Sequence, residues 1–170
     1  MLEVATNVAV LLVALTVLSI FAINYFLEPS LPKLRPGLQK GATLASIPTL
    51  DYRGNKNILL IALDTNCQFC KESLPFYRKL LEANVSSQKV LRIVAIFPND
   101  ADDVTKYIRE NDFPIDTIAS IPLNSLGLSG TPSLLLLNPN GEVKDFWIGK
   151  LSSAETDELI RSLTSSNPND

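Results

Sequence analysis

The 170-residue sequence predicts an α/β domain preceded by an N-terminal transmembrane helix. Short apolar runs suited to buried strands alternate with helical patterns, and a turn sequence near residue 140 joins two strands as a hairpin. An uncharged apolar run near the N-terminus indicates the transmembrane helix. The length and the hydrophobic fraction of 46% fit one domain with a sizeable core and one additional apolar segment.

The apolar run is the segment 4–27, VATNVAVLLVALTVLSIFAINYFL, which contains no charged residue. Its densest part, from Val8 to Leu27, would span roughly 30 Å as a helix and so match the hydrocarbon core of a bilayer. A cleaved secretory signal is the main alternative, but the preceding residues lack a basic region and no clear cleavage site follows. A buried globular helix would show a polar face, which this segment lacks. We therefore expect an uncleaved transmembrane anchor.

Residues 28–40, EPSLPKLRPGLQK, contain three prolines and a glycine, so they cannot continue a helix and are predicted to form a juxtamembrane linker. The folded domain is then expected to cover 41–170. Three basic residues of the linker, Lys33, Arg35 and Lys40, follow the anchor, and by the positive-inside rule they favour a cytoplasmic domain.

The first half of the domain reads as strand, helix, strand, helix. Residues 57–63 and 90–97 are apolar runs suited to strands that are buried on both faces. Apolar residues at helical spacing follow the first run: Cys70, Leu74, Tyr77 and Leu81. The second run is followed by 102–111, which has the pattern of another helix.

The second half of the domain reads as a hairpin and a last helix. Residues 133–137 form an apolar strand, 138–141 (NPNG) a turn, and 142–149 an alternating strand that returns as a hairpin. The last helix is predicted to begin at Ser153.

The composition excludes several classes of function. The sequence contains no histidine, which removes Cys/His nucleophile pairs, Ser/His/Asp triads and imidazole metal ligands. The net charge is -3 and no run of basic residues provides a surface for phosphate backbones, so we expect no nucleic-acid partner.

The only two cysteines, Cys67 and Cys70, lie three positions apart in 63–77, LDTNCQFCKESLPFY. A closed zinc or iron–sulfur site needs four ligands, which this chain does not supply without a dimer or unusual carboxylate ligation. A structural disulfide is a second alternative, although a loop this short would add little stability. The third is redox chemistry, which we favour. At the start of a helix, unpaired N–H groups and the dipole stabilise a thiolate at Cys67, and Cys70 is placed to attack a mixed disulfide formed there.

These and later residues resemble the motifs of thioredoxin-like oxidoreductases. The motifs are CQFCKESLP (67–75), GTPSLLLL (130–137), NPNGEV (138–143) and WIG (147–149). The resemblance covers about 41–165. The long interval between Cys70 and Pro132 is similar to that of the membrane-anchored periplasmic branch that includes TlpA and ResA. The resemblance implies a thioredoxin-like fold, with a central mixed β-sheet flanked by helices.

Carried over by position, the resemblance makes Cys67 the exposed attacking thiol and Cys70 the buried resolving thiol. It makes Pro132 a cis-proline that faces the pair, and Thr131 the residue that offers its backbone N–H and C=O to an extended substrate peptide. It implies no cofactor beyond the redox-active disulfide Cys67–Cys70. Without the resemblance, the residues leave two interpretations of Pro132. A proline that enters an apolar strand marks either a strand start or a special peptide bond.

Two positions depart from the family pattern. Thioredoxins usually carry a tryptophan before the first cysteine, where this chain has Asn66, and an aspartate six residues before it, where this chain has Ile61. The usual buried proton acceptor is therefore missing. Asp64 and Glu72 are the candidates for an acid/base replacement, and a helix cap or a solvated charge is the alternative for each.

We therefore expect a membrane-anchored thiol-disulfide oxidoreductase. The resemblance favours a reductase, for example in cytochrome c or metalloprotein maturation, although the dipeptide between the cysteines does not fix the direction. A non-catalytic thioredoxin-like module that binds proteins is the alternative. Copper delivery is a third hypothesis, but copper carriers of this fold generally add a histidine.

The expected partners are proteins and the membrane. Substrates would be protein thiols or disulfides, a membrane-embedded redox partner would serve the same pair, and the N-terminal helix would hold the chain in the bilayer. The resemblance places the domain outside the cytoplasm, in the periplasm or its equivalent, where disulfides persist. The basic linker argues for the opposite orientation.

Overall fold

The computed structural model describes residues 16–18, 38–44 and 55–164. The chain divides into two units, Met1–Pro36 and Gly37–Asp170. Within the described residues, no helix is both long and apolar enough to cross a bilayer. Most of the predicted anchor over 4–27 and most of the linker over 28–40 lie outside the described residues, so both stay predictions.

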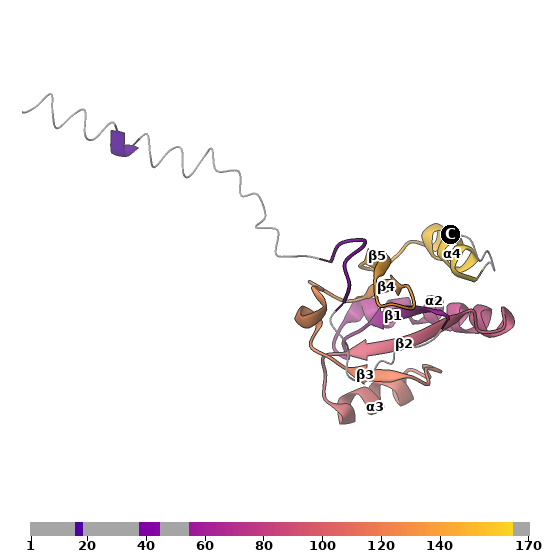
Figure 1. Ribbon diagram of the computed structural model, residues 1–170. Helices are drawn as coiled ribbons and strands as arrows, with labels where there is room; N and C mark the ends of the chain where they lie inside the picture. Colours follow the sequence, from indigo (N-terminus) through magenta and orange to yellow (C-terminus); the bar gives the residue numbers. More distant parts are fainter. Residues whose placement is uncertain (1–15, 19–37, 45–54, 165–170) are drawn as a thin grey trace, which may run out of the picture. The chain divides into compact units, whose positions relative to one another are not determined.

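The second unit is an α/β domain built on a mixed sheet (Figure 1). Its elements, in chain order, are β1 (Asn57–Ala62), α2 (Gln68–Ser86), β2 (Leu91–Phe97), α3 (Ala101–Glu110), β3 (Ile118–Ser120), the 3-10 helix η2 (Leu123–Leu126), β4 (Ser133–Leu137), β5 (Val143–Ile148) and α4 (Ser153–Thr164). The strand order is β3-β2-β1-β4-β5. β1 pairs with β2 in parallel and with β4 antiparallel, so β1 lies at the centre of the sheet.

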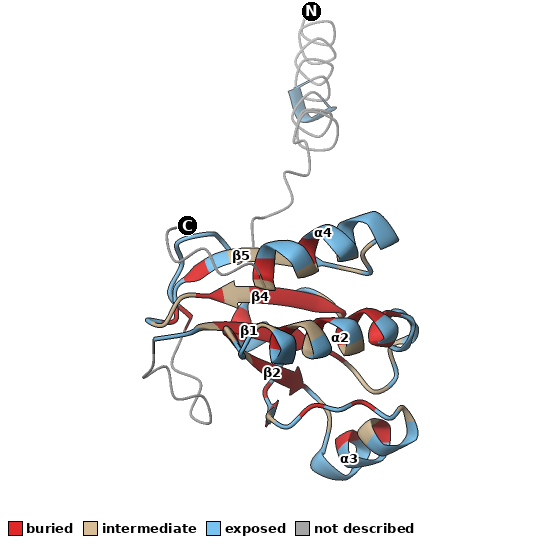
Figure 2. Cartoon of the chain, turned by 90° about the vertical axis from the view of Figure 1, so that its right-hand side faces the viewer, coloured by how far each residue is buried: buried red, intermediate tan, exposed pale blue. Residues whose placement is uncertain are grey.

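Apolar residues cover both faces of the sheet, as the continuous apolar runs predict. On one face, Leu59, Ile61 and Leu63 pack with residues of α2, α3 and α4. On the other, Ile58 and Leu60 pack with residues of η2 and its flanking loops. Figure 2 shows the buried residues concentrated on the central strands and on the helix faces that meet them.

The strands and the helix for which bounds were predicted occur with bounds that differ by at most one residue, but two elements were not predicted. β3 pairs in parallel with β2 and η2 follows it. β3 has only three residues, of which the outer two are exposed, so it carries no apolar run. Its strand pairing depends on a neighbour distant in sequence, which a local pattern does not reveal.

Tyr107 of α3 is buried against Phe97, with the ring centroids 5.7 Å apart. Its hydroxyl is a buried group without a hydrogen-bond partner among the described residues. Burial, and secondarily the negative charge of Asp64, raise the pKa of Tyr107. The hydroxyl therefore stays protonated, and its desolvation is uncompensated within the described part of the chain.

We expect Tyr107→Phe to leave the free energy of unfolding unchanged or to raise it by up to about 1 kcal/mol, because it removes a polar group that has lost its water. Tyr77→Phe is the matched control. The buried Tyr77 hydroxyl interacts with Ser73, so its removal should lower the free energy of unfolding by about 1 kcal/mol. Urea unfolding followed by circular dichroism compares the two variants. Equal losses in both would contradict the prediction.

Candidate active site

The two cysteines follow the central strand and begin α2. In the loop after β1, Asp64 Oδ1 accepts the N–H of Asn66 at 2.8 Å, and the Asp64 carbonyl accepts the N–H of Cys67 at 3.1 Å. The N–H of Thr65 donates to Asn99 Oδ1 at 3.1 Å, which ties this loop to the loop after β2. These bonds turn the chain sharply from the strand into the helix.

Cys67 and Cys70 form a disulfide, with their Cα atoms 5.2 Å apart. Cys67 is half-buried, whereas Cys70 is completely buried, and this order of exposure agrees with the sequence-based expectation. Cys67 is the N-cap of α2, and its Sγ accepts the N–H of Cys70 at 3.1 Å. The first turn contains no acidic residue. The N–H groups and the helix dipole therefore stabilise negative charge on this sulfur when the pair is reduced.

The segment before β4 lies against the disulfide. The Thr131–Pro132 peptide bond is cis, as the resemblance implies. The Thr131 carbonyl oxygen lies 3.6 Å from Cys67 Sγ, although the two residues are 64 positions apart. The Pro132 carbonyl accepts the N–H of Gly149 at 2.7 Å. The structure thus brings together Cys67, Cys70, Thr131 and Pro132.

The two acid/base candidates have different surroundings. Glu72 is on the exposed side of α2, where it forms an ion pair with Lys150 at 2.6 Å and accepts Gln68 Nε2 at 3.1 Å. These contacts, led by the hydrogen bond from Lys150, lower the pKa of Glu72. Asp64 is half-buried and supports the turn before the helix. The proton-acceptor role of each stays a prediction.

The sequence analysis assigned no role to Phe69, Ile148 or Lys150, although it included Trp147 and Ile148 in the WIG motif. Phe69, between the cysteines, is 59% exposed, and Ile148, at the end of β5, is 53% exposed. Lys150 contacts Glu72 although the two residues are 78 positions apart in the sequence, and a local sequence pattern does not reveal such a contact. Trp147 is half-buried and packs against the same apolar cluster as Cys67.

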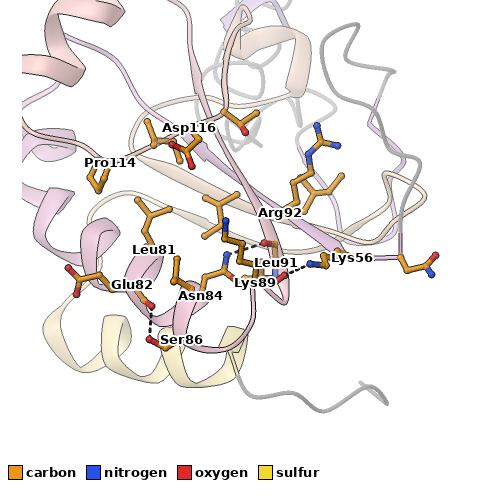
Figure 3. A pocket seen from close by; sticks show the side chains of 16 residues that line it. Lys56, Leu81, Glu82, Asn84, Ser86, Lys89, Leu91, Arg92, Pro114 and Asp116 are labelled. Carbon is orange, nitrogen blue, oxygen red and sulfur yellow. Dashed lines mark hydrogen bonds between the residues drawn. The ribbon is translucent and has the colours of Figure 1, made fainter.

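A cavity of about 820 Å³ lies at the end of the sheet opposite the disulfide. Figure 3 shows the side chains that line it. The cavity is lined by the beginnings of β1 and β2 and by the end of α2, whereas the cysteines follow the end of β1. Its walls combine apolar Leu81 and Leu91 with charged Lys56, Arg92 and Asp116. Among the described residues, no group of three potential metal ligands occurs.

No family model matches the chain, and neither does any curated protein sequence. Solved structures do match its fold. The thioredoxin domain of a thiol-disulfide oxidoreductase from Bacteroides vulgatus is 17% identical with a TM-score of 0.59, over 76% of this chain and 100% of that one. A thiol:disulfide interchange protein from Bacteroides sp. is 17% identical with a TM-score of 0.59, over 76% and 93%. A candidate thiol:disulfide interchange protein DsbE from Chlorobium tepidum is 18% identical with a TM-score of 0.60, over 76% and 100%.

At these identities the comparison establishes the fold, and the predicted thioredoxin-like fold is confirmed. The mixed sheet and the helices of the domain agree with it. The N-terminal helix that was predicted to cross a membrane is not part of this finding, because the predicted span lies largely outside the described residues.

We expect the reduced protein to be alkylated first at Cys67. At mildly acidic pH iodoacetamide should modify Cys67 at least about tenfold faster than Cys70, because thiolate is the reactive form and only Cys67 combines access with a helix N-terminus. Mass spectrometry of the peptides at early times measures both rates. Preferential labelling of Cys70 would reverse the assignment of the two thiols.

Proposed function

We propose that this chain is a thiol-disulfide oxidoreductase that exchanges disulfides with protein substrates through Cys67 and Cys70. One observation carries the proposal: Cys67 Sγ caps α2 and lies 3.6 Å from the Thr131 carbonyl. The helix start stabilises charge on an attacking sulfur, and the backbone of Thr131 beside it offers hydrogen bonds to an extended substrate segment. The names of the structural neighbours describe proteins of the same chemistry.

As a reductase, the protein would act by two exchanges at sulfur. The Cys67 thiolate attacks one sulfur of a substrate disulfide, forms a mixed disulfide and releases the other substrate sulfur as a thiolate. Cys70 then loses its proton and attacks Cys67 Sγ, which releases the second substrate sulfur and leaves the Cys67–Cys70 disulfide. Two electrons pass from the protein to the substrate, and the released thiolates take up protons. Of the two acid/base candidates, we propose Asp64 as the acceptor of the Cys70 proton, because the Glu72 carboxylate is engaged by Lys150 and Gln68.

The setting that we propose follows from the sequence. The apolar segment 4–27 would anchor the chain, with the domain outside the cytoplasm, in the periplasm or its equivalent, where disulfides persist. A membrane-embedded redox partner would reduce the Cys67–Cys70 disulfide after each turnover. Maturation of cytochrome c or of another metalloprotein is the pathway that the TlpA/ResA-like resemblance favours.

The orientation can be tested with reporters fused after Asp170. We expect a reporter that is active only outside the cytoplasm to be active, since stable disulfides of substrate proteins form and persist mainly outside the cytoplasm. A reporter that is active only inside serves as the control. If only that second reporter is active, the domain lies in the cytoplasm, as the positive-inside rule predicts from the basic residues in 33–40.

The exchange itself can be tested by trapping. Cys70→Ser keeps the first exchange and removes the second, so mixed disulfides between Cys67 and substrates should accumulate. Cys67→Ser is the matched control and should trap far less, because Cys70 is completely buried. Pro132→Ala, with both cysteines intact, should lengthen the lifetime of the adducts if Pro132 shapes the substrate groove.

Affinity purification of the Cys70→Ser protein with and without reductant gives the readout. Adducts that depend on Cys67 and disappear with reductant would support the oxidoreductase and identify its substrates. Recovery of the same partners under both conditions, with either cysteine replaced, would instead indicate a module that binds proteins without turnover.

A further inference from the structure

A closed ring of contacts connects residues of the candidate active site. On one side, Gln68, which follows Cys67, donates to Glu72 at 3.1 Å. Glu72 accepts Lys150 Nζ at 2.6 Å, and Lys150 follows Gly149. On the other side, the N–H of Gly149 donates to the Pro132 carbonyl at 2.7 Å.

The ring closes at the disulfide, where the Thr131 carbonyl lies 3.6 Å from Cys67 Sγ. It therefore joins two walls of the site. One wall is the start of α2, from Gln68 to Glu72, and the other is the Thr131–Pro132 segment with the end of β5. The Glu72–Lys150 ion pair is the contact between side chains that connects them.

The ion pair contributes little to the stability of the fold. Both side chains are exposed, at 44% for Lys150 and 36% for Glu72, and exposed pairs stabilise proteins weakly. Docking of α4, which follows Lys150, depends on its own buried residues Leu159 and Leu163. A role in stability or in docking α4 is therefore a poor explanation of the pair.

Packing does not by itself set the spacing of the two walls at this point. A cavity of about 210 Å³ lies beside the pair, between α2 on one side and the segment that leads from Gly149 through Lys150 into α4 on the other. A closely packed interior would fix the distance between two elements, but a cavity leaves it adjustable. The φ angle of Gly149, +90°, lies in the region that favours glycine, and this turn directs the chain from β5 toward α2.

We propose that the Glu72–Lys150 ion pair holds the two walls at the spacing that an extended protein segment requires next to Cys67. Glu72 and Lys150 are then positioning residues for the exchange, and their effect depends on the size of the substrate. A protein disulfide has to enter between the walls, whereas a small disulfide needs access to Cys67 Sγ alone. This inference rests on the function proposed above.

The test compares insulin, a protein disulfide, with oxidised glutathione, a small disulfide, as oxidants of the pre-reduced full chain in detergent. The chain's own dithiol supplies the two electrons, and the second-order rate constant of this single exchange gives kcat/KM. Glu72→Gln and Lys150→Met each remove one charge, and a double variant with both charges exchanged, Glu72→Lys with Lys150→Glu, restores an ion pair. Lys106→Met is the matched control, because Lys106 forms a similarly exposed pair with Glu110 at 4.0 Å within α3.

We expect each single variant to lower kcat/KM for insulin by about threefold to tenfold, and to change kcat/KM for oxidised glutathione by less than about twofold. The exchanged pair should recover most of the loss, and Lys106→Met should behave like the natural protein. High salt should lower the insulin rate of the natural protein toward that of the single variants, because exposed charges are screened.

Unchanged insulin kinetics in both single variants would overturn the inference. An equal loss with both substrates would also overturn it, because the charges would then act on the cysteines rather than on the groove. If the exchanged pair does not recover the lost insulin activity, one of the two charges contacts the substrate directly. This outcome would also overturn the inference. Failure of the proposed function is distinct: the natural protein would reduce neither disulfide.

Discussion

Cys67 Sγ occupies the place of a capping oxygen at the start of α2, where it accepts the N–H of Cys70 at 3.1 Å. This contact defines the chemistry of the site, because it places one sulfur where backbone N–H groups stabilise charge and the other one turn inside the helix. It requires α2 to begin directly after Cys67. The chain meets that requirement through β1, which is buried on both faces, and through the turn at Asp64 that follows it.

The second wall of the site follows from the register of the sheet. β4 runs antiparallel to β1, and Ser133 is paired with Ala62. The first residue of β4 therefore lies opposite the last residue of β1, and Thr131 and Pro132 come directly before it. The same pairing brings the end of β5 to this edge, because Ile148 is paired with Ser133. A shift of the register would separate Thr131 from Cys67.

Local sequence patterns predicted what depends on local structure. Apolar runs located β1 and β2, and the spacing of the cysteines located the start of α2. The cis bond before Pro132 came from the family resemblance, since the residues alone left a strand start as an alternative. The pairing of β3 with β2 and the contact of Lys150 with Glu72 join distant parts of the chain, and a pattern in a single sequence does not encode such pairings. The roles of the residues at the site, unlike their positions, depend on chemistry that the fold alone does not establish.

Ile61 makes the proton chemistry of this site differ from the usual arrangement of the fold. Ile61 is completely buried in the apolar cluster that also contains Cys70, so no carboxylate reaches the resolving sulfur from the middle of β1. In the exchange that we propose, Cys70 loses its proton at a place where an anionic sulfur has no hydration. Any carboxylate that accepts the proton has to act from the border of the cluster. Asp64 is at that border, where its negative charge helps to raise the pKa of the buried Tyr107.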